Sequence, residues 1–244
     1  MQSKNPAPKK SVLVVVSNPA VSPVTQWPIG FWWAELSHAW LEFSQVRYSI
    51  TIASPGGGDL QADGWSDPEH ESGYAANDII SLGFKKSPIT SKLIQDTPKL
   101  SSLKTEDFDA VFVVGGQGPM VTMIDDVALQ KTVAAFFESG KIVAAVCHGT
   151  CVLLKTRLSN GDLLVRGKTW TGFANSEERY AEAAAGLKIQ PFWIEDEAAK
   201  IAETNFITGG LLAEFAVRDG TLITGQQQVS SALAARKVIE ALGH

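Results

Sequence analysis

Short apolar runs recur along the chain, and stretches with helical spacing separate them. The runs cover residues 11–17, 48–53, 110–114 and 142–146. None of them alternates strictly between apolar and polar residues, which is typical of strands buried on both faces of a sheet. The helical patterns cover residues 31–43, 128–139, 176–185 and 230–242. This alternation predicts an α/β fold, in which a mostly parallel sheet lies between layers of helices.

Two further features define the expected domain. Near the end of the chain, Glu214–Arg218 and Thr221–Thr224 flank Asp219-Gly220, a pair that favours a hairpin turn. Residues 55–98 have no clear period and are rich in glycine, serine and proline, but their tryptophan and leucines need a core. We therefore expect this segment to be a small inserted cap over the sheet. The prediction is one domain over residues 11–244, preceded by a flexible leader at residues 1–10.

The composition argues against several classes of protein. The formal net charge of −5 does not suit a nucleic-acid partner or an anionic membrane surface. No segment approaches the roughly 18 apolar residues that cross a bilayer, and residues 1–10 lack the apolar core of a signal peptide. Two cysteines form no disulfide framework, so a reducing, cytoplasmic compartment is expected. The four histidines offer no convincing metal site.

Cys147 directly follows the apolar run at residues 142–146, and a buried helix is expected to open at Cys151–Leu154. A residue at such a strand-to-helix turn holds its side chain above the sheet, where active sites of parallel sheets gather. The positive end of the next helix favours a thiolate. Cys147 is therefore the candidate nucleophile, although many free cysteines are simply small buried hydrophobes. Cys151, one turn further, is expected to be such a structural residue.

Three groups are candidates to assist Cys147. His148 needs a sharp turn to reach the sulfur, and a carboxylate from elsewhere would orient its ring, as in a triad. The glycines of Gly115–Pro119 follow a strand, and they form either a plain turn or a cradle of N–H groups for an oxyanion. Glu35 lies next to tryptophans. Their apolar surface would raise its pKa and suit it to exchange protons with a thiolate, although most helical glutamates face water.

Three segments together resemble the DJ-1/PfpI superfamily, whose fold is the flavodoxin-like, doubly wound fold of class I glutamine amidotransferases. They are AVCHGT (145–150), VVGGQGP (113–119) and IGFWWAEL (29–36). Further segments resemble the heat-shock-protein-31 branch, known as glutathione-independent glyoxalases. These are GDLQADGWSDP (58–68), GKTWTGFANSEE (167–178) and DGTLITGQ (219–226). The resemblance extends from about Ser11 to about Leu242.

This resemblance implies a catalytic triad. Cys147 would be the nucleophile and His148 its partner, while Glu178 would orient His148. The neighbouring Glu177 also fits an ordinary first helical turn, and only the family's spacing favours Glu178 over it.

The resemblance also implies an oxyanion site and a reaction. Glu35 would hydrogen-bond the cysteine, and Gly116 would form the oxyanion site with Gly149 or the backbone of His148. The implied enzyme is a homodimer without metal or cofactor, and it converts methylglyoxal or a related 2-oxoaldehyde and water to lactate.

The chain departs from the branch at two places. Thr150 stands where proline is usual, and Gln226–Gln228 stand where relatives carry an Asn-Pro-Ala-Ser run, which puts the substrate preference in doubt. Two other functions remain open. One is a holdase chaperone or redox sensor with an apolar patch at residues 27–40. The other is a cysteine amidase or peptidase, whose pocket the segment at residues 55–98 would narrow.

Overall fold

The computed structural model describes residues 9–244, so most of the expected leader at residues 1–10 lies outside the described residues. The main sheet has six strands in the order β4-β1-β5-β6-β10-β9. Their bounds are β1 Ser11–Val15, β4 Ser49–Ala53, β5 Ala110–Val113, β6 Ile142–Val146, β9 Ala216–Asp219 and β10 Leu222–Gly225. All neighbours pair in parallel except β9 and β10. The prediction of a mostly parallel sheet is confirmed.

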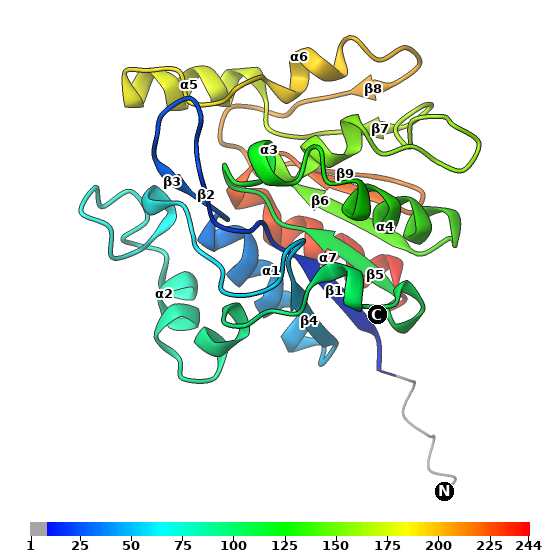
Figure 1. The fold of residues 1–244 in the computed structure, drawn as a ribbon, viewed down its shortest axis with the longest axis horizontal. Coiled ribbons are helices and arrows are strands. Elements are labelled where there is room, and N and C mark those ends of the chain that lie inside the picture. The colour runs from blue at the N-terminus through cyan, green and yellow to red at the C-terminus, as the bar shows by residue number, and fades with distance from the viewer. Residues whose placement is uncertain (1–8) are drawn as a thin grey trace, which may run out of the picture.

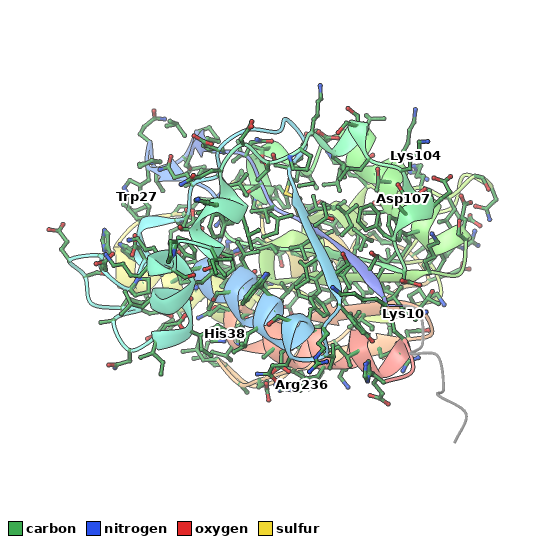
Figure 2. The ribbon with its side chains drawn as sticks, turned by 90° about the horizontal axis from the view of Figure 1, so that it is seen from below. Lys10, Trp27, His38, Lys104, Asp107 and Arg236 are labelled. Atoms are coloured by element: carbon green, nitrogen blue, oxygen red, sulfur yellow. The ribbon has the colours of Figure 1, made fainter. Side chains whose placement is uncertain are left out.

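The sheet is covered on both faces (Figure 1). Helices α1 (Trp33–Gln45) and α7 (Ser231–Ala241) lie side by side on one face, and α4 (Val127–Glu138) lies on the other. On the first face, Arg236 of α7 donates hydrogen bonds to Glu42 of α1 and to Glu214 (Figure 2). Strands β5 and β6 are buried along their whole length, which explains why their sequences show no alternation.

The β9–β10 hairpin has the expected location with a one-residue shift. Asp219 pairs with Leu222, so the two loop residues are Gly220 and Thr221. Gly220 takes the left-handed conformation, with φ of +64°. Glycine adopts this conformation at little cost, which fixes the position of the turn.

The segment at residues 55–98 contains the short helices η1 (Gly64–Ser66) and η2 (Thr90–Ile94) and one α-helix, α2 (Ile79–Lys86). Phe84 of α2 packs edge-on against Trp40 and Trp33 of α1, with ring centroids 5.3 and 6.0 Å apart. Asp78 accepts a hydrogen bond from Ser81 N–H at the start of α2 and contacts His38 of α1 at 2.9 Å. The segment therefore has the buried aromatic contacts expected of a cap. Its status as an insertion stays a prediction.

The remaining elements are short, apart from α5 (Asn175–Ala185). They are β2 (Ala20–Val21), β3 (Pro28–Ile29), η3 (Leu100–Ser102), η4 (Thr105–Asp107), α3 (Pro119–Thr122), η5 (Cys147–Leu154), β7 (Thr169–Trp170), α6 (Ile194–Ala198), β8 (Asn205–Phe206) and η6 (Gln228–Ser230). Helices α5 and α6 and strands β7 and β8 gather on one side of the molecule (Figure 1). Within residues 9–244, no helix has the length and apolar character to span a bilayer.

Candidate active site

Cys147 is the first residue after β6, and its φ is +55°. A non-glycine residue at positive φ is strained by roughly 1–3 kcal/mol and persists only where its surroundings hold it. The expected helix begins earlier than Cys151, at Cys147 itself, and it is the 3₁₀-helix η5. Thr150, which replaces the usual proline, donates its hydroxyl to the Cys147 carbonyl at 2.7 Å. Cys151 is fully buried, as expected of a structural cysteine.

The tight turn brings adjacent side chains together. His148 Nδ1 lies 3.5 Å from Cys147 Sγ, and His148 Nε2 lies 3.0 Å from Glu178 Oε1. The His148 ring also stacks on Phe173, with centroids 4.1 Å apart. Glu178 and Phe173 hold the His148 ring in this position. The imidazole can therefore take a proton from the sulfur, while the carboxylate stabilises the resulting positive charge.

Glu177 makes a different set of contacts from its neighbour. Its Oε1 accepts hydrogen bonds from Gln226 Nε2 at 2.9 Å and from Leu212 N–H at 3.2 Å. Its Oε2 accepts from Ala174 N–H at 3.2 Å, at the start of α5. Of the two adjacent glutamates, Glu178 is therefore the one in contact with His148.

Glu35 lies in the first turn of α1 and is completely buried. Its Oε2 accepts a hydrogen bond from Gly115 N–H at 2.7 Å, and its Oε1 is buried without a close partner among residues 9–244. Burial raises the pKa of Glu35 to about 8, against smaller opposing effects of the Cys147 thiol and the Gly115 N–H. A Cβ on Gly115 would lie 2.5 Å from Glu35 Oε2 and 2.9 Å from Cys147 Cβ, so glycine is required where these groups converge.

The sequence predicted a thiolate at Cys147, whereas its surroundings in the structure favour the protonated thiol. Burial raises the pKa of Cys147 well above its ordinary value of 9, and the neighbouring Glu35 raises it further. The N–H groups of His148 and Gly116 oppose this rise but do not overcome it. A helix end alone therefore does not keep the sulfur ionised. Because Glu35 and Cys147 are both buried and adjacent, they hold at most one negative charge between them.

The backbone groups that were expected to form the oxyanion site have different surroundings in the structure. The backbone N–H groups of Gly116 and His148 act on the Cys147 sulfur, and Gly116 has the φ of +101° that its turn requires. Gly149 instead packs its Cα against the carbonyl groups of Val113 and Val114. The Gly116 and His148 N–H groups thus face the reacting sulfur, while the oxyanion roles of Gly116 and Gly149 stay predictions.

A pocket of about 150 Å³ opens at the sulfur. Cys147 is only 3% exposed, but it belongs to the pocket wall together with His148, Glu177 and Glu178. The rest of the wall comes from Trp27, Trp32, Trp65, Tyr74, Gln117, Phe173, Tyr180, Ala181, Ala184, Ile189, Gln190, Leu212 and Gln228. Trp27 lies at the opposite end of the molecule from Lys10 at the start of β1 (Figure 2), so the pocket lies beyond the carboxyl ends of the parallel strands.

The sequence matches the model of the DJ-1/PfpI family over residues 78–241. The chain belongs to the DJ-1/PfpI family. It is 26% identical to a probable glutathione-independent glyoxalase, hsp3103, of Schizosaccharomyces pombe, over 87% of this chain and 90% of that protein. It is also 26% identical to the glutathione-independent glyoxalase HSP31 of Saccharomyces cerevisiae, over 97% and 99%. The crystal structure of glyoxalase III from Candida albicans superposes with a TM-score of 0.77 at 26% identity, over 95% and 97%.

One buried carboxylate of this DJ-1/PfpI chain was missed by sequence reasoning. Asp63 Oδ1 accepts a hydrogen bond from Gly30 N–H at 2.9 Å, and Oδ2 accepts one from Gln117 N–H at 2.7 Å. Burial raises the pKa of Asp63 to about 7, although both N–H groups lower it. Asp63 thereby connects two parts of the site. One is the loop at Gly30 that leads into α1, the helix that carries Glu35, and the other is the turn that contains Gly116. No group of three or more His, Cys, Asp or Glu able to hold a metal occurs among residues 9–244.

Asp63→Asn is expected to misplace this turn. One of the two backbone N–H groups would then face an amide NH₂ and lose its acceptor, which costs about 1–3 kcal/mol of stability. A shift of the turn should lower kcat/KM for any reaction at Cys147 roughly 10- to 100-fold. Kinetics and urea unfolding measure both effects. Asp59→Asn is the control, because Asp59 is exposed and, among residues 9–244, its side chain accepts a hydrogen bond only from Asp96 N–H. Equal losses in the two variants would contradict the assignment.

Proposed function

We propose that this protein is a glutathione-independent glyoxalase, which converts a 2-oxoaldehyde and water to a 2-hydroxy acid at Cys147. The similarity to three glyoxalases over nearly their whole lengths supports the proposal. The observation that carries it is the position of Glu35. This carboxyl group has a pKa of about 8 and adjoins a cysteine at the base of a pocket. The proposed reaction needs such a group, because a proton must move between two neighbouring carbons.

In the first step, the Cys147 sulfur attacks the aldehyde carbon and passes its proton to His148. A carbon–sulfur bond forms, and the aldehyde oxygen takes up the electron pair of the broken π bond. The N–H groups of Gly116 and His148 stabilise this oxyanion, which then takes a proton to give a hemithioacetal. Glu178 holds the imidazole in place for this transfer.

In the second step, the Glu35 carboxylate removes the hydrogen from the former aldehyde carbon and returns a proton to the former ketone carbon. The product is a thioester of the 2-hydroxy acid. Water then adds to the thioester, and the carbon–sulfur bond breaks. One carbon is oxidised and its neighbour is reduced, so the reaction needs no external oxidant. A group with a pKa near 8 is suited to both directions of this proton transfer.

Two alternatives have less support. Of the four tryptophans at positions 27, 32, 33 and 40, Trp33 is buried and the others are only partly exposed, which gives little support to the apolar patch that a holdase would need. Trp65 and Tyr74 of residues 55–98 belong to the pocket wall and leave little room for the extended chain of a peptidase substrate. The homodimer and the cytoplasmic location stay predictions from the sequence.

The test is an assay for D- and L-lactate from methylglyoxal in the absence of glutathione. We expect the wild-type protein to form mainly one enantiomer, because Glu35 delivers the proton from one side. Cys147→Ala should form no lactate, and Glu35→Gln should form very little. If the wild-type protein produces no 2-hydroxy acid from any 2-oxoaldehyde, the proposal is wrong.

A further inference from the structure

Away from the reacting groups, the pocket wall is mostly aromatic and has no basic side chain. It contains six aromatic side chains, which are Trp27, Trp32, Trp65, Tyr74, Phe173 and Tyr180. No lysine or arginine belongs to the wall, and Glu177 and Glu178 are both acidic. A substrate with a carboxylate or phosphate group would therefore meet no opposite charge. The wall suits an uncharged, apolar substituent.

Helix α5 extends the pocket away from the nucleophile. Glu178 contacts His148 near the start of the helix, while Ala181 and Ala184 follow it at intervals of three residues and also belong to the wall. Residues three apart lie on nearly the same side of a helix. At 1.5 Å per residue, Ala184 lies about 9 Å further along the axis than Glu178. The two alanines leave space that a larger side chain would fill.

Tyr74 and Trp32 contact each other in the aromatic wall. Gln228 Nε2 lies 3.1 Å from Tyr74 Oη, and the Tyr74 ring meets Trp32 edge-on, with centroids 5.9 Å apart and an interplanar angle of 88°. Gln228 belongs to the segment where this chain departs from the glyoxalase branch. The departure therefore contributes a residue to the wall, and this residue contacts one of the aromatic side chains.

We propose that the preferred substrate is a 2-oxoaldehyde whose ketone carbon carries an aryl group. This inference rests on the proposed function. The methyl group of methylglyoxal extends one carbon beyond the ketone and would contact only the wall next to Cys147. An aryl ring extends along Ala181 and contacts the aromatic side chains, which prefer such rings in offset or edge-on geometry. With phenylglyoxal, the reaction with water gives mandelate by the same internal transfer of hydrogen.

The first experiment compares kcat/KM for phenylglyoxal and methylglyoxal without glutathione. We expect phenylglyoxal to be preferred by at least about 10-fold, the scale of discrimination that apolar pocket contacts give. Ala181→Leu fills the space along α5 and should lower the phenylglyoxal-to-methylglyoxal ratio by a similar factor. Ala183→Leu adds the same atoms to an exposed position of α5 outside the wall, so its ratio should stay unchanged.

A binding measurement covers the case in which Ala181→Leu does not fold. Mandelate should bind wild-type and Cys147→Ala protein at least about 10-fold more tightly than lactate. Binding is measured from the change in tryptophan fluorescence. Equal binding of the two acids, or a substrate ratio that favours methylglyoxal, would overturn the aryl preference and leave the glyoxalase proposal intact. Failure to convert either substrate would overturn the glyoxalase proposal itself.

Discussion

Cys147→Ala is expected to reduce turnover of 2-oxoaldehydes by about 10⁴-fold or more. Every covalent step of the proposed reaction forms or breaks a bond to this sulfur, and no other thiol lines the pocket. Removing the nucleophile of a catalytic triad removes nearly all of the rate that the triad provides. Product formation at high enzyme concentration, followed for hours, measures the residual rate.

The fold should survive this substitution. Alanine keeps the Cβ and so keeps the same strain at φ of +55°, and the melting temperature should change little. Cys151→Ala is the matched control. Cys151 is fully buried and contacts the Pro119 carbonyl at 3.5 Å, so its loss should lower stability by roughly 1 kcal/mol while activity remains. Activity that persists in Cys147→Ala would exclude a covalent mechanism at this residue.

The sheet was predictable because its strands are continuous apolar runs. Runs such as residues 110–114 and 142–146 are buried on both faces, and such burial leaves a clear pattern in the sequence. The two-residue strands, such as β7 (Thr169–Trp170), leave none, because two residues have no period. Helix α2 was missed because its sequence, IISLGFKK, contains a glycine in a segment rich in turn formers.

The site was predictable where a local sequence pattern marks a residue, as the aromatic neighbours of Glu35 do. Cys147 and His148 stand at one turn, and that turn is recognisable from the strand before it. Glu178 was assigned by resemblance alone, because its contact with His148 joins parts of the chain 30 residues apart. Asp63 could not be distinguished from Asp59 or Asp67 in the sequence. Its role depends on two N–H groups that only the folded chain brings together.

Glu35→Gln is expected to lower activity and raise stability, and both effects should grow as the pH rises to 8 and reach their full size above it. Glutamine can still accept the Gly115 hydrogen bond, but it cannot carry a proton between two carbons. A loss of about 10²- to 10⁴-fold in kcat is expected for a missing acid–base group. In the wild-type protein, kcat/KM should rise as the pH passes through about 8, because the carboxylate of Glu35 forms there. The variant should lose this rise.

The effect on stability follows from the same pKa. The ordinary pKa of a glutamate is 4.5 and that of Glu35 is about 8, so between these values the folded state holds a proton that the unfolded state has released. The free energy of unfolding therefore falls as the pH rises through this window. Glutamine does not titrate. Glu35→Gln should match the wild-type protein at pH 4.5 and exceed it by a few kcal/mol at pH 8, measured by urea unfolding.

Glu42→Gln supplies the matched control on the same helix. Glu42 pairs with Arg236 at 2.8 Å on the surface and does not line the pocket, so the substitution should change stability by less than about 1 kcal/mol and leave activity intact. A Glu35→Gln protein that is less stable than the wild type at pH 8 would mean that the buried carboxyl group stabilises the fold. Such a result, or full activity in the variant, would remove Glu35 from the proposed proton transfer, because its high pKa is the property on which that transfer depends.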